Sequence, residues 1–453
     1  MEQQVIPEGY KQTEVGVIPE DWELKRGDEL TSLIVKGASP RWQGFSYTNE
    51  GMLFVTSENV RYGFLDISNP KYLPLEFHEK LKRSKLKKGD ILINLVGASI
   101  GRSCYVYSYL GEANVNQAVA VYRLLEKYNA QYVACYLNSS ICIERIIDMQ
   151  VDAARPNISL GDLRRFSIPL PMSEVEQTAI ATTLSTTDTL INELEKLIQK
   201  KQAIKTATMQ QLLTGKTRLP QFALREDGTK KGMKESEVGE IPEDWECLPM
   251  SKLTTLMTNG FVGTAKTHYT DRADGITYIQ GYNVEENSFN YNGIKKVTTE
   301  FHKKNAKSCL KTGDILMVQT GDVGLVTIVP QELEGSNCHA LIINRFSHDH
   351  YSKYFAYLLN SKKERQRLKE LETGTTMKHI NVGDLLEFIV SFPRLFDEQK
   401  AIADTLSDMD NEIQKIESRL SKTRQIKQGM MQELLTGRTR LIKPKDRGVE
   451  DAA

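Results

Sequence analysis

Apolar residues recur with two different periods along the chain of 453 residues. In two long stretches, 172–214 and 394–436, they follow steps of four and three, without proline and with Gly429 as the single glycine. This heptad spacing predicts two long helices, each with a narrow apolar stripe typical of a coiled coil. The predicted helix–helix seam consists of Ile180, Leu184, Thr187, Ile191, Leu194 and Ile198, and of Ile402, Leu406, Met409, Ile413, Ile416 and Leu420.

Sequence signals also predict where the two helices end. Ser173 and Glu176 are spaced as a capping box, and Gly215 and Gly437 are expected to stop the helices. The second stretch has Leu395 in place of Ser173, so its helix is expected to begin later, near Asp397. Two rods of roughly 60 Å with one seam register most simply pack on each other. The alternative, that each helix only covers its own globule, normally requires a broader stripe.

The remaining segments predict short strands and one further helix in each half of the chain. Apolar runs at 91–96 and 315–320 follow Lys-x-Gly-Asp turns, and further β-rich runs lie at 115–125 and 340–346. Helices are expected at 128–147 and 350–371, each passing through a Leu-Asn-Ser sequence. The fold class is therefore α+β, with two globules separated by two long helices.

The chain is an internal duplication. Residues 9–23 recur at 232–246 with 11 of 15 positions identical, and residues 76–92 recur at 300–316 with 11 of 17 identical. Residues 176–219 recur at 398–441 with 23 of 44 identical, and the offset stays at 222 to 224. By contrast, residues 24–75 and 247–299 share little. One frame with different loops suggests two modules that do the same job on different targets, whereas the alternative is neutral drift in exposed loops.

Composition limits the possible environment and partners. Hydrophobic residues make up 40% and charged residues 26%, and no apolar run is long enough to span a membrane. The first ten residues lack the pattern of a secretory signal, and six scattered cysteines contain no CxxC pair, so we expect a cytoplasmic protein. Lys plus Arg equals Asp plus Glu at 59 each, so nucleic-acid binding would require segregated basic patches.

No motif predicts an active site, a metal or a cofactor. The sequence 213–217, Leu-Thr-Gly-Lys-Thr, resembles the end of a P-loop, but Gln210 stands where that loop needs glycine, which favours a helix stop. The chain lacks the Pro-Pro of an adenine methyltransferase, and it has no HExxH sequence. His348 and His350 are interpreted as part of a solvated loop, and His78 and His302 as structural residues without partners.

Basic residues cluster at equivalent places in the two copies. The segment 80–88 corresponds to 303–311, the positions just before the Gly-Asp-Leu turns at 161–163 and 383–385 correspond, and the Gly-rich loops 36–45 and 259–269 correspond. Such residues can bind phosphates or read base edges, although a charge run is more often a solvated face. The predicted DNA-binding residues are Arg41, Lys80, Lys82, Arg83, Lys85, Arg155, Asn157, Lys266, Lys303, Lys304, Lys307 and Lys378.

Two long motifs, each present twice, resemble those of a known family. An opening ESEVGEIPEDWE-type segment and a closing EQxAIAxTLS…LLTG(K/R)TRL segment are similar to those of the specificity subunits of type I restriction–modification systems. The resemblance covers essentially the whole chain. It implies two target recognition domains and two long helices in antiparallel contact, related by pseudo-two-fold symmetry.

The resemblance also implies a non-catalytic subunit that reads a bipartite, asymmetric site on double-stranded DNA. The helices would set the spacing of the half-sites and dock two modification subunits, which would use S-adenosylmethionine. Two restriction subunits would add ATP- and Mg-dependent translocation and cleavage. The alternative is a coiled-coil scaffold that joins two ligand-binding domains without DNA recognition, and the salt dependence of DNA binding would distinguish the two.

The expected domain boundaries follow from the repeat and the helical stretches. They are 1–171 for the first target recognition domain, 172–218 for the first helix, 219–237 for a polar linker, 238–393 for the second target recognition domain, 394–441 for the second helix and 442–453 for a flexible tail.

If the helices act as a ruler, their length fixes the unread spacer between the half-sites. One heptad inserted after both Ile198 and Leu420 keeps the seam in register and adds about 10.5 Å, or roughly three base pairs. We expect methylation sequencing, with the modification subunit present, to find the same half-sites and a spacer longer by at most about three base pairs. An active mutant that still modifies the original spacer would contradict the ruler.

Overall fold

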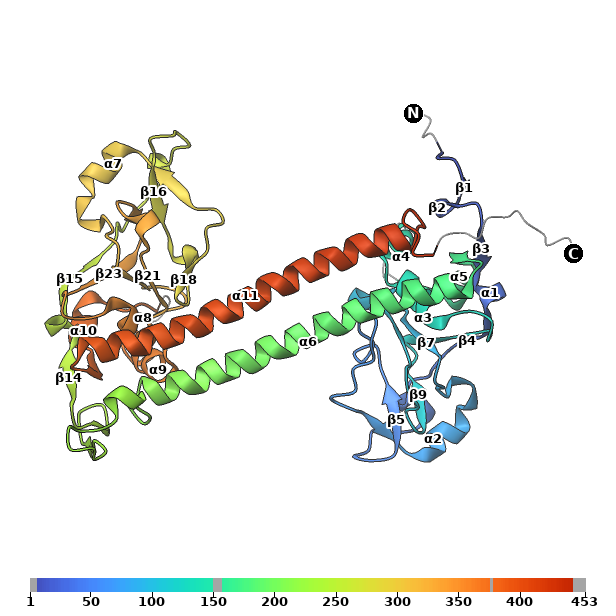
Figure 1. The fold of residues 1–453 in the computed structure, drawn as a ribbon, viewed down its shortest axis with the longest axis horizontal. Helices are drawn as coiled ribbons and strands as arrows, with labels where there is room; N and C mark the ends of the chain where they lie inside the picture. The colour runs from blue at the N-terminus through green and yellow to red at the C-terminus, as the bar shows by residue number, and fades with distance from the viewer. Residues whose placement is uncertain (1–5, 150–156, 375–377, 443–453) are drawn as a thin grey trace, which may run out of the picture. The chain divides into compact units, whose positions relative to one another are not determined.

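The computed structural model describes residues 6–149, 157–374 and 378–442. The chain divides into two compact units, of which unit 1 contains Met1–Lys196 and Glu417–Ala453 and unit 2 contains Leu197–Ile416. The two long helices, α6 (Glu174–Leu212) and α11 (Phe396–Leu434), each contribute one part to each unit (Figure 1). Each unit is therefore built from segments that lie far apart in the sequence.

Unit 1 contains a four-stranded antiparallel sheet of order β4-β10-β7-β8, a three-stranded sheet β6-β5-β9, and the pairs β1-β2 and β11-β3. Its strands are β1 Tyr10–Thr13, β2 Gly16–Pro19, β3 Trp22–Arg26, β4 Thr31–Lys36, β5 Met52–Val55, β6 Tyr72–Leu73, β7 Ile91–Asn94, β8 Ser103–Tyr105, β9 Ala113–Val115, β10 Val119–Leu124 and β11 Ser167–Pro171. Its shorter helices are α1 Gly27–Leu30, α2 Leu75–Lys80, α3 Ala130–Leu137, α4 Ser140–Asp148 and α5 Leu160–Arg165.

Unit 2 repeats this topology with the sheets β15-β23-β20-β21, β19-β16-β22 and β14-β24, the pair β12-β13, and an additional hairpin β17-β18. Its strands are β12 Met233–Lys234, β13 Ile241–Pro242, β14 Trp245–Pro249, β15 Thr254–Asn259, β16 Ile276–Ile279, β17 Val284–Glu285, β18 Ser288–Phe289, β19 Lys295–Val297, β20 Ile315–Val318, β21 Val326–Ile328, β22 Asn337–Cys338, β23 Leu341–Phe346 and β24 Ile389–Pro393. Its shorter helices are α7 Thr299–Lys304, α8 Ser352–Asn360, α9 Lys362–Glu370 and α10 Val382–Leu386. The same strand order therefore forms from segments that share little sequence.

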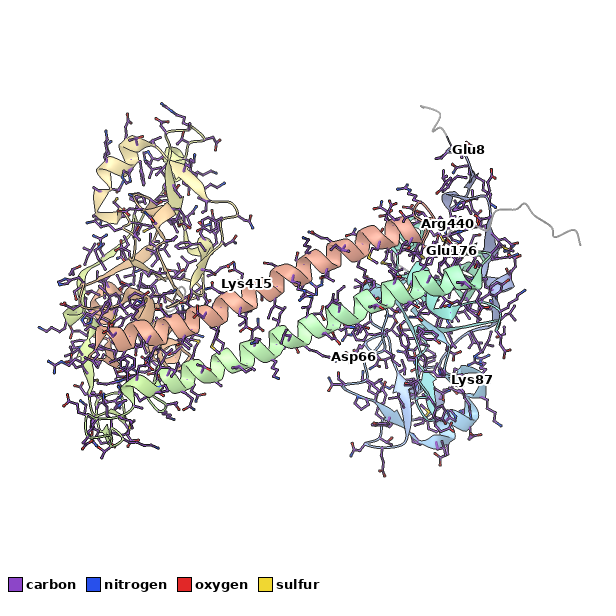
Figure 2. The ribbon with its side chains drawn as sticks, viewed as in Figure 1. Glu8, Asp66, Lys87, Glu176, Lys415 and Arg440 are labelled. Carbon is purple, nitrogen blue, oxygen red and sulfur yellow. The ribbon has the colours of Figure 1, made fainter. Side chains whose placement is uncertain are left out.

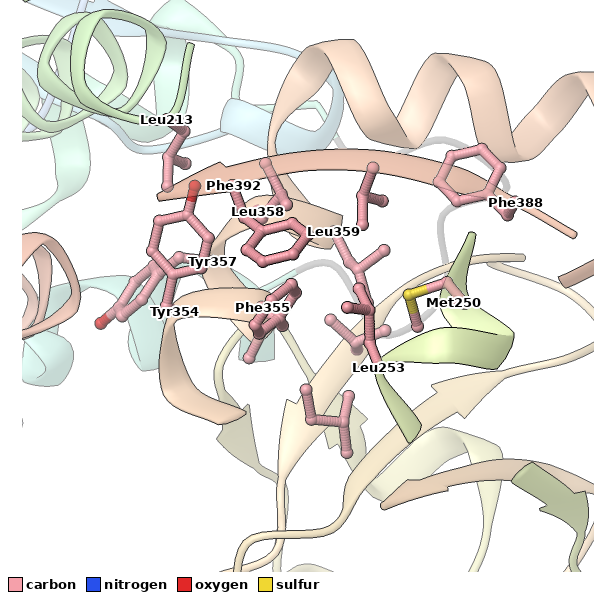
Figure 3. Close-up of a cluster of buried hydrophobic side chains, with 14 of the residues drawn as sticks. Leu213, Met250, Leu253, Tyr354, Phe355, Tyr357, Leu358, Leu359, Phe388 and Phe392 are labelled. Carbon is pink, nitrogen blue, oxygen red and sulfur yellow. The ribbon is translucent and has the colours of Figure 1, made fainter. Parts of the chain in front are cut away.

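The start of one long helix and the end of the other complete each core. In unit 1, Ile180 and Leu184 of α6 and Leu434 of α11 belong to one buried cluster with Trp22. The corresponding cluster of unit 2 joins residues of α11, α6, α8 and β24, and Figure 3 shows part of it. The cluster includes Ile402, Leu406, Leu212, Tyr354, Phe355 and Phe392, together with Leu213 directly after α6. The alternative that each helix only covers its own globule is therefore wrong, since each also completes the other unit's core.

The two long helices run antiparallel, as predicted. In unit 1, Asp188 pairs with Lys427 at 2.5 Å and Glu195 pairs with Arg424 at 2.6 Å, so rising numbers on α6 meet falling numbers on α11. In unit 2, the Nζ of Lys205 lies 2.6 Å from Asp410. The predicted seam residues are buried at 180, 184, 194, 198, 402, 406, 413 and 420, and half-buried at 187, 191, 409 and 416.

An arginine just beyond the end of each long helix ties three segments together. In unit 1, Arg440 donates to Glu176 (Nη2–Oε2 2.7 Å), and Figure 2 labels both residues. Arg440 also donates to Asp21 (Nη1–Oδ1 2.9 Å), and its guanidinium lies 5.9 Å from the Trp22 ring centroid. Glu176 lies in the first turn of α6 and Asp21 in the opening segment. The end of one helix, the start of the other and the opening segment are thereby joined at one point.

Unit 2 contains the same arrangement around Arg218. Its Nε donates to Glu398 at 2.6 Å and its Nη1 to Asp244 at 2.8 Å, and the guanidinium lies 5.8 Å from the Trp245 ring centroid. Desolvation raises the pKa of Asp244, but hydrogen bonds from Arg218 and Lys231 outweigh it and bring the pKa to about 2. The carboxylate is therefore ionised at neutral pH and accepts two cationic donors.

The helix ends confirm the predicted glycine stops. Gly215 and Gly437 adopt φ values of 67° and 71°, a region that favours glycine. A Cβ on Gly437 would also lie 2.4 Å from the Pro19 ring, and one on Gly215 would lie 2.2 Å from the Pro242 ring. The helix stop and the Ile-Pro-Glu-Asp-Trp segment are thus in direct contact, which explains why both occur in each copy.

The predicted helix starts need correction. Ser173 Oγ does accept from the Glu176 backbone N–H at 3.4 Å, but the Glu176 carboxylate bonds Arg440, so only half of the capping box forms. The second helix does not begin later, since α11 starts at Phe396, the position equivalent to Glu174. The backbone carbonyl of Leu395 accepts from the Glu398 N–H at 3.1 Å, so no serine is needed.

Three predicted elements are split in the structure. The expected helices at 128–147 and 350–371 each break into two at Leu-Asn-Ser, because Ser139 and Ser361 cap α4 and α9 by accepting backbone N–H bonds. Asn138 donates to the carbonyl of Ser103 in β8 at 2.8 Å, and Asn360 donates to that of Val326 in β21, also at 2.8 Å. The expected strand at 115–125 is likewise two strands, β9 and β10.

The polar segment 219–237 is ordered in the structure. It contains the 3₁₀ turn η4 (Pro220–Phe222) and β12, which pairs with β13 of the opening segment. Lys231 binds Asp244 at 2.7 Å, and Arg225 binds Glu243 at 2.8 Å. The tail predicted at 442–453 lies, beyond its first residue, outside the described residues.

We predict that Arg440→Ala lowers the free energy of unfolding by about 3 kcal/mol, because it leaves the buried Glu176 without its charge partner. The control Arg424→Ala removes a pair of exposed side chains and is expected to cost less than about 1 kcal/mol. Chemical denaturation of the full chain, followed by circular dichroism, measures both. Equal losses in the two variants would contradict the role assigned to Arg440.

Candidate nucleic-acid interface

In unit 1, the structure brings the predicted loop 36–45 against the basic segment that follows β6. Lys80 of α2 donates to the carbonyl of Gln43 at 3.3 Å, and its Nζ lies 5.6 Å from the Phe45 ring centroid. Phe45 in turn packs edge-on against Phe77 of α2, with centroids 5.4 Å apart. The loop is therefore anchored, and it holds Arg41 and Trp42 outward in the 3₁₀ turn η1 (Arg41–Gln43), where Trp42 is 89% exposed.

The other basic residues of this segment differ in whether they form an ion pair. Lys85 pairs with Glu79 at 2.8 Å, and Lys82 lies 3.9 Å from the same carboxylate. The hydrogen bond from Lys85 lowers the pKa of Glu79. Arg83, Lys87 and Lys88 are exposed. The predicted cluster is therefore partly neutralised within itself.

Unit 2 places its predicted residues in the same way. The turn η6 (Lys266–His268) lies against α7 because the His268 ring packs on Phe301, with centroids 4.8 Å apart. Within the described residues, no ion pair is formed by the four lysines of the neighbouring segment, and all four are exposed. They are Lys303, Lys304, Lys307 and Lys311. Unit 2 thus presents the less neutralised of the two basic surfaces.

The second predicted pair of sites is also matched in position. Asn157 forms a backbone bridge with Val96, just after β7, and His379 forms one with Thr320, just after β20. Lys378 is exposed and lies 3.3 Å from Glu372. Arg155 falls outside the described residues, so its predicted role has no structural counterpart here.

The histidines at positions 78 and 302 do have partners, which corrects the sequence prediction. Buried His78 contacts Asn114 and Glu112, and His302 lies 3.3 Å from Asn337. Each asparagine also donates to the backbone after the basic helix, to Leu81 in unit 1 and to Asn305 in unit 2, both at 3.0 Å. These contacts fix the basic segment on the three-stranded sheet.

The interpretation of the second histidine pair as a solvated loop is half right. His348 is exposed, but His350 packs edge-on against Phe355 and Phe392, and burial lowers its pKa. Within the described residues, no group of three His, Cys, Asp or Glu side chains could hold a metal ion.

The two units share a further set of equivalent hydrogen bonds, made by one asparagine in each unit, that the sequence comparison did not predict. In unit 1, Asn59 Oδ1 accepts from the Thr56 N–H at 2.8 Å, and its Nδ2 donates to the Asp66 carbonyl at 2.9 Å. In unit 2, Asn283 makes the equivalent bonds to Gln280 (3.0 Å) and to the Asn290 carbonyl (2.9 Å). A constant offset of 224 therefore aligns 52–73 with 276–297 residue for residue. At this offset the identical positions are Asn59 and Asn283, Val60 and Val284, and Lys71 and Lys295.

A buried ion pair braces the four-stranded sheet of each unit. Asp90 pairs with Arg123 at 2.7 Å, and Asp314 pairs with Arg345 at 2.7 Å. Both aspartates are 1% exposed or less, and each also accepts the backbone N–H three residues earlier. The repeated Gly-Asp-Ile-Leu sequence contained this signal, but its arginine partners lie about thirty residues away and were not recognised.

Unit 1 also contains a polar cleft of about 460 Å³. It is lined by Ser57, Glu58, Asn59, Arg61, Asp66, Ser68, Asn69, Lys71, Ser99 and Arg102. Hydrogen bonds from the Ser68 side chain and backbone lower the pKa of Asp66, and one from Lys71 lowers the pKa of Glu58. Both carboxyls are therefore ionised at neutral pH.

The two units define a class of protein in which one α+β frame is used twice with different side chains on its surface. The family profile described as "Type I restriction modification DNA specificity domain" matches residues 19–206 and 250–424, well over half of the chain. The chain belongs to this family, whose members are the non-catalytic specificity subunits of type I restriction–modification enzymes. Within the described residues, no helix is long and apolar enough to cross a membrane.

Individual relatives agree with this assignment over the full length. The specificity subunit of the type I restriction enzyme MjaVIII of Methanocaldococcus jannaschii is 25% identical over 447 residues, 96% of each chain. The crystal structure of a type I restriction–modification S subunit from M. genitalium matches 91% of this chain and 96% of its own, with a TM-score of 0.57 at 16% identity. That likeness confirms the fold, two α+β domains with two long helices packed together.

We predict that DNA shields Trp42 from acrylamide. Of the three tryptophans, Trp22 and Trp245 are each 1% exposed, so quenching of the intrinsic fluorescence reports mainly on Trp42. If the loop beside Lys80 contacts DNA, saturating duplex at low salt should lower the quenching constant at least about two-fold. The control Trp42→Phe should show no accessible component. Unchanged quenching, with binding verified by anisotropy, would exclude this loop from the interface.

Proposed function

We propose that this specificity subunit reads a bipartite, asymmetric site on double-stranded DNA, with one half-site for each target recognition domain. The first domain comprises residues 1–171 and the second residues 238–393. In this proposal, the surfaces beside α2 and α7 approach the phosphates, and loops carried by the same frame read the bases.

One observation carries the proposal: the frame is the same in both units while the exposed residues on it differ. Arg61 and Tyr62 correspond to Glu285 and Glu286. The hydrogen bonds that hold this segment, from Asn59 in unit 1 and from Asn283 in unit 2, are nevertheless equivalent. A frame kept for stability alone would not require exposed basic segments at equivalent places. Two copies of one binding surface with different side chains are what an asymmetric two-part target requires.

The long helices and the partners complete the proposal. The helices at 172–218 and 394–441 set the distance between the half-sites and dock two modification subunits, which supply methylation from S-adenosylmethionine. Up to two restriction subunits, with ATP and Mg, would attach to the same complex. Membership of the family supports these partners.

A scaffold that joins two ligand-binding domains without DNA recognition is the alternative. The match of both halves to a DNA specificity domain weighs against it. The two functions also differ in salt dependence, because a protein that neutralises phosphates loses affinity steeply as salt rises.

We predict that exchanging residues 238–393 for the equivalent segment of a relative changes one half-site only. The reason is that this segment supplies every strand of unit 2 except β12 and all of its shorter α-helices, and none of the elements of unit 1. Methylation sequencing of DNA from cells that express the chimaera with the modification subunit reads both half-sites. The reciprocal exchange of residues 1–171 is the matched control.

Changes in both half-sites, or in neither, would overturn the assignment of one half-site to each domain. If the full chain does not bind duplex DNA, or if its binding does not weaken between about 50 and 200 mM salt, the scaffold is favoured instead.

A further inference from the structure

The polar cleft of unit 1 is built from three segments that the frame holds in place. Residues 57–61 follow β5, residues 66–71 precede β6, and residues 99–102 precede β8. The bonds of Asn59 tie the first segment to the second. The backbone of Arg102 is fixed by its N–H to the Ser99 carbonyl (3.1 Å) and by its carbonyl, which accepts from the Asn94 N–H (2.9 Å).

Arg102 contacts an aromatic ring and, among the described residues, forms no ion pair. Its guanidinium carbon lies 4.9 Å from the Tyr62 ring centroid. Its Nε is buried, and no acceptor lies within hydrogen-bonding distance of it among the described residues. A guanidinium supported on an aromatic face keeps a fixed plane while its N–H donors stay available. Arg102 therefore has the geometry of a donor that lacks its acceptor.

The neighbouring charges are mostly satisfied among themselves. Lys71 pairs with Glu58 at 2.6 Å, and Asp66 accepts from the Ser68 hydroxyl at 2.7 Å. Arg61 reaches Asp66 only through a long contact of 3.4 Å and is 45% exposed. The cleft thus offers arginine donors from Arg102 and Arg61 beside carboxylate acceptors.

Unit 2 shows that these arginines are not part of the frame. Positions equivalent to Arg61 and Glu58 are Glu285 and Tyr282, and Tyr282 donates to the Gly293 carbonyl at 2.7 Å. The position equivalent to Arg102 is Leu325, one residue before the strand that Asn360 binds. Because unit 2 builds the same frame without any of these side chains, their presence in unit 1 needs a reason other than folding.

We propose that Arg102, with Arg61 beside it, reads a guanine in the half-site of unit 1. Arginine donates to O6 and N7 of guanine in the major groove, and a carboxylate such as Glu58 or Asp66 accepts from N4 of the paired cytosine. The carboxylates also disfavour a phosphate in the cleft. This inference rests on the proposed function, since it names the residues by which one domain selects its bases.

The test uses the full chain and a library of randomised duplexes, with sequencing of the bound fraction. The variants are Arg102→Ala, Arg102→Lys, Arg61→Ala and the control Arg26→Ala, which removes an exposed arginine paired with Asp28 in the same unit. We expect Arg102→Ala to lose the preference for one guanine in one half-site by roughly 10- to 100-fold. Arg61→Ala should weaken the preference within the same half-site, and the control should leave both half-sites unchanged.

Arg102→Lys separates base reading from phosphate binding. Lysine keeps the charge but lacks the fork, so it should lose the guanine preference as well. If Arg102 instead binds phosphate, Arg102→Ala will weaken all sequences alike, the slope of log K against log salt will change by about 0.9, and Arg102→Lys will restore binding. That result would overturn the proposal, as would an unchanged preference in folded Arg102→Ala.

Failure of the proposed function would look different. In that case the wild-type chain would enrich no sequence at all, whereas failure of the Arg102 proposal leaves a defined bipartite sequence that does not respond to the variants. Thermal unfolding of each variant verifies its folding, and Arg102→Lys preserves volume and charge if the alanine variant proves unstable.

Discussion

The structure depends on a charged contact that occurs once in each unit. In it, an arginine binds two carboxylates while its guanidinium lies near a tryptophan ring. Arg440 in unit 1 and Arg218 in unit 2 each join the end of one long helix to the first turn of the other and to the opening segment. An arginine suits this position because its fork binds two carboxylates while its face lies on an aromatic ring. The contact explains why the opening and closing motifs are both retained in the two copies: they are partners in space.

The sequence predicted the features that periodicity and repetition reveal. The long helices, their packing on each other and the duplication depend on regular spacing over tens of residues, which local context cannot easily obscure. The antiparallel direction of the helices was implied only by the family resemblance. Helix breaks and caps were predicted less well. Ser139 and Ser361 cap a second short helix where one longer helix was expected. Glu176 bonds an arginine 264 residues away instead of the backbone beside it. Such choices depend on partners that only tertiary structure brings together.

For the candidate interface, clusters of Lys and Arg in the sequence predicted where the basic segments lie. They did not predict which of these side chains pair with a carboxylate. Lys85 and Lys82 share Glu79, so counting charges overestimated what is free in unit 1. The cleft could not be predicted, because Arg61 and Arg102 are 41 positions apart and meet only through the frame around Asn59. In this cleft, side chains that are the same in both units belong to the frame, and side chains that differ are candidates for recognition. Equivalent positions could be assigned only from the structural alignment of the two units.

The division of each long helix between the two units has a consequence for how the chain folds during synthesis. Unit 2 is one continuous stretch, so it can close as soon as residue 416 has left the ribosome. Unit 1 begins to emerge first, yet its core includes Leu434 and Leu435, and Arg440 comes later still. Until then, Ile180, Leu184 and Trp22 lack part of their cover. The domain translated first is therefore completed last, and it is the one that most needs protection from aggregation while translation continues.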